Sequence, residues 1–200
     1  LGKEICIAFL AFFFLYIGFS KKIKSMPQQN IYTIGHSTHT IELFLAMLHS
    51  FNIQALADIR GLPGSRRYPQ FNKENLKISL ENEGIQYTHF AELGGRRKVN
   101  KDSHNNRWKN DSFKAYADYM ETNEFEQGIH PLEKLATEKT TVYMCAEVLW
   151  WRCHRSMVSD YLKAKNWNVL HIMSVGICQE HIYTSPARVV GTKVFYFDEK

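Results

Sequence analysis

The pattern of apolar and polar positions along the chain alternates between two periods. Short β-prone runs, typical of buried strands, are separated by stretches in which apolar residues recur every three or four positions, as on one face of a helix. We expect strands at residues 31–34, 55–60, 86–90, 141–145 and 168–172. Helical patterns occupy residues 40–51, 72–83, 113–120, 129–135 and 157–162.

This order of elements predicts a fold class. A strand, a helix and a second strand within about 30 residues form a βαβ unit, whose crossover is right-handed. We therefore expect a single three-layer α/β domain with a mostly parallel, Rossmann-like sheet built from βαβ units. Residues 174–180 are expected to form a turn or short helix, and residues 189–197 are expected to form a C-terminal edge hairpin that turns at Gly191-Thr192.

The first 25 residues form a doubtful extension ahead of the domain expected at residues 26–200. Residues 5–19 are apolar or small and are flanked by lysines, but a membrane span usually needs about 20 residues. The segment has three interpretations: a mis-extended start before Met26, a membrane anchor, or a cleaved signal. For the core domain we expect no membrane association.

Charge and cysteine content bear on the kind of ligand site and on the cellular compartment. The formal net charge is +5, but residues 1–25 carry four of the 25 basic and one of the 20 acidic side chains, which leaves 21 and 19, or +2, from Met26 onward. An anion site would therefore have to be local. Four cysteines in a chain of 200 residues do not make a secreted disulfide framework, so we expect a cytoplasmic, reduced protein.

Three loops that follow expected strands carry most of the chemically able side chains. They are residues 35–37, 58–67 and 145–155. If the strands are parallel, the three loops lie on one rim of the sheet, where α/β proteins bind ligands. A shared pocket at this rim is the main structural prediction.

Cysteine chemistry is one candidate activity of the rim. Cys145 ends a strand and Cys153 precedes a helix, positions at which a thiolate can be stabilised. Cys145 is the candidate nucleophile or polar anchor, Glu147 or His154 the general acid–base, and His36 a further base or phosphate ligand. Two buried core cysteines and a structural histidine are the alternative.

A metal site is weighed against this assignment. Cys145, Cys153 and His154 could supply three ligands and His36 a fourth. However, the spacing of the two cysteines is not that of a zinc knuckle, and adjacent residues on a helix point about 100° apart. We therefore predict no metal, and the sequence does not identify a cofactor. A phosphatase-type loop is not supported either, because Trp151 stands where its arginine would be.

Several arginines are expected at the same rim. A guanidinium binds phosphate through two parallel hydrogen bonds, so a phosphorylated ligand is a natural prediction. Salt bridges to Asp58, Glu92 or Glu147 are the alternative role, and Trp150 and Trp151 could stack on a base or cover the core. The candidate ligand-binding residues are Ser37, Arg60, Ser65, Arg66, Cys153 and Arg155.

These motifs together resemble a known family. They are Ile34-Gly35-His36-Ser37, Asp58-Ile59-Arg60 with Pro63 and Ser65-Arg66, Leu93-Gly94-Gly95, Cys145-Ala146-Glu147 with Cys153-His154-Arg155, and His171-Ile172. In this order they resemble the family called domain of unknown function 488, over residues 31–172. The resemblance implies an α/β sandwich with the motifs on one side of the sheet, and no established reaction. Residues 148–151 depart from the more polar loop expected there.

The preferred functional hypothesis is an enzyme-like domain that binds a phosphorylated ligand, a nucleotide or a nucleic-acid end at the rim. Two alternatives stay open. The first is a thiol redox or sulfur-transfer protein that uses Cys145 and Cys153, and the second is a noncatalytic ligand-binding module. No sequence pattern specifies the oligomeric state.

Overall fold

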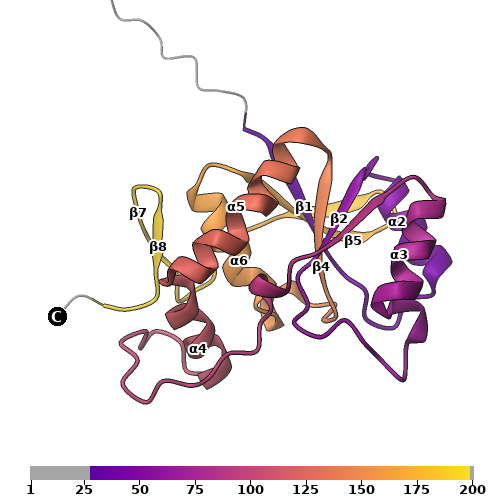
Figure 1. Ribbon diagram of the computed structural model, residues 1–200. Coiled ribbons are helices and arrows are strands. Elements are labelled where there is room, and N and C mark those ends of the chain that lie inside the picture. Colours follow the sequence, from indigo (N-terminus) through magenta and orange to yellow (C-terminus); the bar gives the residue numbers. More distant parts are fainter. Residues whose placement is uncertain (1–27, 199–200) are drawn as a thin grey trace, which may run out of the picture.

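A six-stranded sheet lies at the centre of the computed structural model, which describes residues 28–198 (Figure 1). Its strand order is β3-β2-β4-β1-β5-β6; the first five strands are parallel and β6 is antiparallel. The strands are β1 (Asn30–Gly35), β2 (Ala55–Asp58), β3 (Gln86–His89), β4 (Thr141–Cys145), β5 (Asn168–Ser174) and β6 (Ile177–Glu180). The predicted parallel sheet is confirmed.

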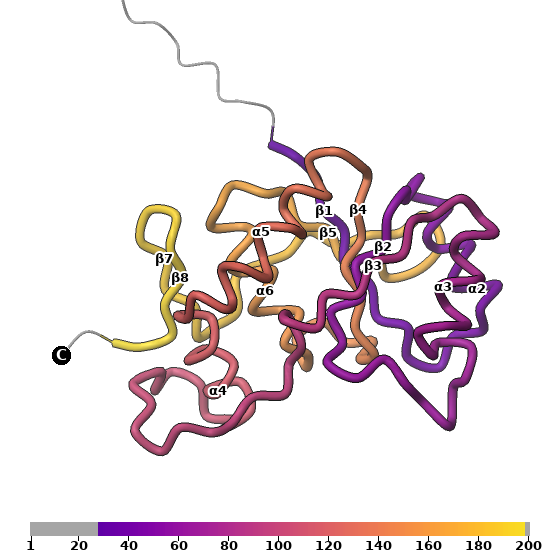
Figure 2. Tube along the Cα trace, in the orientation of Figure 1, coloured from indigo at the N-terminus to yellow at the C-terminus, as the bar shows by residue number. Residues whose placement is uncertain are grey.

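Helices cover both faces of the sheet, as the views in Figures 1 and 2 show. The helices are α2 (Ile41–His49), α3 (Lys73–Asn82), α4 (Asp111–Met120), α5 (Asn123–Glu138) and α6 (Arg155–Ala164), with short 3₁₀ turns η1 (Pro69–Phe71), η2 (Ala91–Leu93) and η3 (Trp150–Arg152). Buried side chains of α2 and α3 form one core with the sheet, and those of α4, α5 and α6 form another. The three-layer prediction is therefore confirmed.

Local sequence signals explain where the helices begin. Thr40 Oγ1 accepts a hydrogen bond from the backbone N–H of Leu43 at the start of α2 (3.3 Å). Asn110 caps α4 and Thr122 caps α5 in the same way. Side-chain caps satisfy N–H groups that have no partner within the helix. In α2 the apolar face then turns inward, with Phe44, Met47 and Leu48 buried.

The C-terminal region contains one error of the sequence-based prediction and one success. Residues 174–180 contain a turn at Gly176, whose φ is +70°, but Ile177–Glu180 then extend the sheet as β6, which was not predicted. All four β6 residues are exposed. The strand therefore lacks the alternation of apolar and polar residues that identifies a half-buried strand in a sequence. The predicted hairpin exists as β7 (Arg188–Val190) and β8 (Lys193–Phe195), but it forms a sheet of its own.

The parallel crossovers bring the carboxyl ends of three strands together. Gly35 of β1 is paired with Cys145 of β4, and Asp58 of β2 with Met144. Backbone pairing continues past the strands, since the N–H of His36 donates to the carbonyl of Cys145 (3.1 Å). The loops that follow β1, β2 and β4 therefore start from one rim of the sheet, as expected.

No helix in residues 28–198 is long and apolar enough to cross a membrane. The apolar segment at residues 5–19, with its three interpretations, lies outside the described residues.

Candidate functional site

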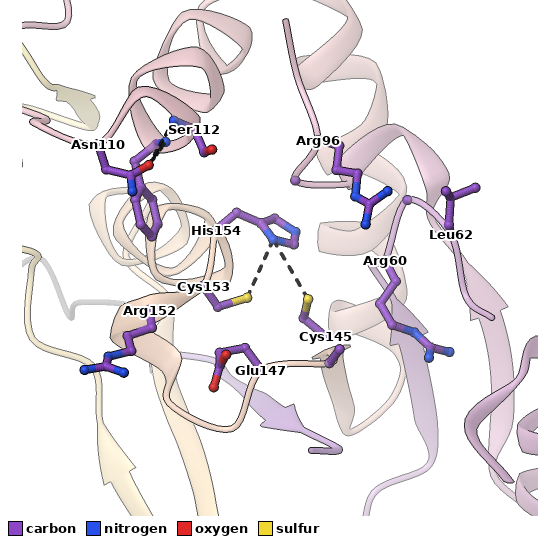
Figure 3. A pocket seen from close by; sticks show the side chains of 14 residues that line it. Arg60, Leu62, Arg96, Asn110, Ser112, Cys145, Glu147, Arg152, Cys153 and His154 are labelled. Atoms are coloured by element: carbon purple, nitrogen blue, oxygen red, sulfur yellow. Dashed lines mark hydrogen bonds between the residues drawn. The ribbon is translucent and has the colours of Figure 1, made fainter. Parts of the chain in front are cut away.

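A pocket of about 460 Å³ opens at the rim, at the carboxyl ends of β2 and β4. Its floor holds two thiols and an imidazole, and its sides come from the loop after β2, the segment after η2 and the start of α4 (Figure 3). The lining residues are Arg60, Gly61, Leu62, Gly95, Arg96, Asn110, Ser112, Phe113, Cys145, Ala146, Glu147, Arg152, Cys153 and His154.

Cys145, Cys153 and His154 form a compact cluster, which we call the floor cluster. His154 Nδ1 lies 3.9 Å from Cys145 Sγ and 3.6 Å from Cys153 Sγ (Figure 3). The three atoms all lie within 4.8 Å of one another. Cys145 is the last residue of β4, and His154 is the N-cap of α6. The strand end and the helix start thus hold the three side chains from opposite ends of one loop.

The floor cluster contradicts one step of the sequence argument. Cys153 and His154 were expected to point about 100° apart, as adjacent residues on a helix do. Cys153 instead has extended backbone angles (φ −128°, ψ 146°) and precedes the helix. With Cys153 outside the helical spiral, its Sγ and the imidazole of His154 face the same point, and the objection to joint ligation no longer holds.

The imidazole of His154 is held by tight packing. A Cβ on Gly95 would lie 2.5 Å from His154 Nδ1, so only glycine lets the backbone pass so close to the ring. The ring of Tyr116 contacts the imidazole edge-on (5.0 Å between centroids), and its hydroxyl donates to the carbonyl of Leu93 (2.9 Å). The Leu93-Gly94-Gly95 motif therefore shapes the pocket floor. His154 Nε2 is buried and has no hydrogen-bond partner in the described part of the chain.

The two thiols have opposite acidities. The pKa of Cys145 lies well below its ordinary value, first because of its interaction with the neighbouring Cys153 thiol and then because His154 and Arg155 lie nearby; burial acts in the opposite direction. The pKa of Cys153 is raised well above its ordinary value by the same interaction with Cys145 and by burial. The two thiols therefore lose their protons as an interacting pair, the first more readily and the second less readily than an isolated thiol.

Arg60 lines the pocket but its charge is already compensated. Its Nε and Nη2 atoms bind the two carboxylate oxygens of Asp58 at 2.8 and 2.6 Å, and both side chains are buried. Tyr87 donates a further hydrogen bond to Asp58 (2.8 Å). The salt-bridge alternative weighed for Arg60 is thus the arrangement observed.

Arg155 lies beneath the floor rather than in the pocket. It is 1% exposed, and its Nη2 atom donates to the carbonyls of Glu147 and Val148 (3.1 and 3.2 Å). Its Nε and Nη1 atoms have no hydrogen-bond partner among residues 28–198. The guanidinium therefore brings an unpaired positive charge under the loop that carries Glu147.

His36 and Ser37 support the site from the side. His36 stacks on Phe71 (4.3 Å) and its Nε2 lies 3.3 Å from Arg60 Nη1. Burial, followed by the charge of Arg60, lowers the pKa of His36 to about 4, so the ring is neutral near pH 7. The N–H of Ser37 donates to the carbonyl of Ala146 (2.9 Å). Neither residue lines the pocket.

The backbones of the β1 and β4 loops are in direct contact. A Cβ on Gly35 would lie 2.0 Å from the carbonyl oxygen of Glu147, so a larger residue at position 35 cannot be accommodated without moving that carbonyl. The short distance between the loops fixes the position of Glu147 relative to β1.

Ser65 and Arg66 lie on the loop after β2 and do not line the pocket. Ser65 Oγ accepts a hydrogen bond from the N–H of Tyr68 (3.0 Å), which stabilises the turn. Arg66 is exposed. Their assignment as ligand-binding residues remains a prediction that gains no support from their positions.

Several lining residues were absent from the predicted site. Arg96 follows the Leu93-Gly94-Gly95 motif, which was a usable signal, whereas no sequence pattern pointed to Asn110, Ser112 or Phe113 at the start of α4. Trp150 does not enter the pocket; it stacks on the buried His171 (4.3 Å, 6° between planes) and anchors the loop.

The fold and the pocket define a class: a three-layer α/β protein with a Rossmann-like sheet and a cysteine–histidine cluster at the carboxyl ends of its strands. The sequence model described as "Domain of unknown function DUF488" matches residues 40–162, which is more than half of the chain. The chain belongs to this family. The match is shorter than the expected residues 31–172 and leaves out β1 and all of β5. No curated protein and no solved structure matches the chain.

Proposed function

We propose that the pocket binds a small anionic ligand that carries a phosphate group, as an enzyme's substrate site does. The observation that carries the proposal is the charge around the cavity. Arg96 and Arg152 line it and have no ion-pair partner in the described residues, and Arg155 adds an unpaired charge beneath it. Glu147 is the acidic residue among the lining side chains.

The size and shape of the cavity agree with a small molecule. Small-molecule sites typically enclose about 300–1,000 Å³, and this pocket has about 460 Å³. Its sides include Leu62 and Phe113, which offer apolar contact, next to the guanidinium groups of Arg96 and Arg152. Arg96 and Arg152 lie on opposite sides of the floor cluster (Figure 3), so a phosphate bound by either one would lie beside the floor.

Isothermal titration calorimetry with inorganic phosphate, pyrophosphate and adenosine monophosphate tests the proposal. Each of R96A and R152A should weaken binding by about ten- to a hundredfold, because hydrogen bonds to a charged group contribute about 1.5–3 kcal/mol. K134A is the control: it removes an exposed positive charge outside the pocket and should leave the affinity unchanged. Equal effects of all three variants, or no binding of any of these anions by the wild type, would contradict the proposal.

Thiol redox or sulfur-transfer chemistry is the second candidate function. Cys145 and Cys153 lie close enough to pair after a small movement, and both face the pocket. With hydrogen peroxide as oxidant, two thiols would become one disulfide while the peroxide is reduced to two water molecules. Mass spectrometry after mild peroxide should find this disulfide, with the exposed Cys178 as an unpaired reference. Reduced thiols at both positions would exclude this function.

A further inference from the structure

We propose that Cys145, Cys153 and His154 bind a zinc ion whose remaining coordination position faces the pocket. The observation is the juxtaposition of two sulfur atoms and one imidazole nitrogen, all within 4.8 Å of one another, on the floor of the cavity. Thiolate sulfur and imidazole nitrogen are the donors that zinc prefers in proteins.

The distances between the donor atoms fit a tetrahedral ion. Zinc binds sulfur at about 2.3 Å and nitrogen at about 2.0 Å, so a tetrahedral angle places a sulfur and a nitrogen ligand about 3.6 Å apart. The observed separations from His154 Nδ1 are 3.6 Å to Cys153 Sγ and 3.9 Å to Cys145 Sγ. The two sulfur atoms lie within 4.8 Å of each other, and a tetrahedral site places them about 3.8 Å apart, so the thiolates would move together by up to about 1 Å when an ion binds.

The three side chains are held in place before any ion arrives. Cys145 belongs to a central strand, hydrogen-bonded to neighbours on both sides. The imidazole of His154 is confined between Gly95 and Tyr116. The backbone N–H of Arg155 donates to Cys153 Sγ (3.5 Å), a contact that supports sulfur as a metal ligand. Binding of an ion therefore requires little further ordering of the three ligand side chains.

The number of ligands indicates the kind of zinc site. Structural zinc sites are closed by four protein ligands, whereas catalytic sites have three protein ligands and an open position for water or substrate. Among the described residues the cluster offers three donors, and all three residues line the cavity. An ion here would act as a Lewis acid toward an anionic ligand in the pocket. That role rests on the proposed function, whereas zinc binding itself does not.

Zinc content is the first measurement. Elemental analysis of the full-length chain, purified without chelator, should find one equivalent of zinc. Cobalt(II) added to chelator-treated, reduced protein should produce a sulfur-to-cobalt charge-transfer band together with the visible bands of a tetrahedral site. A zinc content near zero and no such band would overturn the proposal, as would a disulfide between Cys145 and Cys153 in the freshly purified protein.

Matched variants assign the ligands. C145S, C153S and H154A should each weaken zinc binding by on the order of a hundredfold, whereas C178S, which removes an exposed thiol, should keep full zinc content. G95A should also weaken binding, because its Cβ would displace the imidazole, and G64A, with open space at its Cβ, should not. Zinc retained by a C145S/C153S double variant would overturn the proposal. Cobalt spectra of the chelator-treated wild type provide a readout that does not depend on the folding of any variant.

Phosphate titrations of the zinc-loaded and zinc-free proteins separate the two proposals. If zinc binds normally while R96A and R152A leave phosphate affinity unchanged, the anion site fails and the metal site stands. If phosphate binding depends on these arginines but neither zinc nor cobalt binds, the metal site fails and the anion site stands.

Discussion

Asp58 shows how a single buried carboxylate sets the role of a site residue. It is 0% exposed and binds Arg60 through both oxygens, while Tyr87 donates a third hydrogen bond. Its charge is the counterpart of a guanidinium that is 6% exposed. Removing one partner of such a pair leaves the other charge buried and uncompensated.

We therefore predict that D58N lowers the free energy of unfolding by about 3–5 kcal/mol, because Arg60 would keep its buried charge without a carboxylate. Urea denaturation followed by circular dichroism measures the change. The control is E81Q, which removes the exposed pair between Glu81 and Lys77 (3.7 Å) and should cost less than about 0.5 kcal/mol. Similar effects of the two substitutions would show that the Asp58–Arg60 pair is not the source of stability.

Between elements, a chain of buried hydrogen bonds joins three parts of the fold. Thr33 of β1 bonds to His171 of β5 (2.8 Å), and His171 bonds to His181, which follows β6 (3.0 Å). His181 then bonds to Asp160 of α6 (2.9 Å). These hydrogen bonds connect the sheet to helix α6. They lie next to the loop that Trp150 anchors and therefore stabilise the position of that loop.

These buried hydrogen-bonded histidines make the free energy of unfolding depend on pH. Burial, followed by the charges of His181 and Arg155, lowers the pKa of His171 to about 2, whereas an unfolded histidine has a pKa of about 6.5. Above pH 6.5 the residue is neutral in both states. Below it, only the unfolded state takes up the proton, so stability falls as the pH falls from about 6.5 toward 2, by about 1.4 kcal/mol per pH unit for this residue.

Urea denaturation of the wild type and of H171N at several pH values between 6 and 4 tests this dependence. The variant should lose stability less steeply with falling pH, by about 1.4 kcal/mol per unit. His36, with a pKa of about 4, adds the same type of dependence in both proteins and therefore cancels in the comparison. Parallel pH profiles would show that His171 is protonated equally in both states.

The elements differ in how far the sequence predicted them. The strands β1, β2 and β4 were predictable because each is a β-prone run beside a helical pattern, and their parallel order followed from the crossovers. β6 was not, since its four residues are exposed and lack alternation. The floor cluster was half predicted: Cys145 was placed at a strand end, but the extended backbone at Cys153 depends on how η3 packs, which no local pattern encodes.

At the scale of the whole molecule, the sheet separates two apolar cores, and the reactive side chains lie at the carboxyl ends of its strands. Each face is buried under helices, and the pocket opens where the parallel strands end. The chain from Met26 onward is nearly neutral overall, so the positive charge around the pocket is a local arrangement. Attraction of an anionic ligand should therefore act over short distances only, within about 10 Å at ordinary salt concentrations.

The contact between Gly35 and the Glu147 carbonyl limits how this protein family can change its ligand. Because a side chain at position 35 would collide with that carbonyl, the loop after β4, which brings Glu147 to the pocket, keeps its position only with glycine there. The opposite wall, formed by Arg96 and by Asn110, Ser112 and Phe113, is free of this restriction. Substitutions that change the ligand preference of this protein should therefore be easier to obtain in that wall than in the loop after β4.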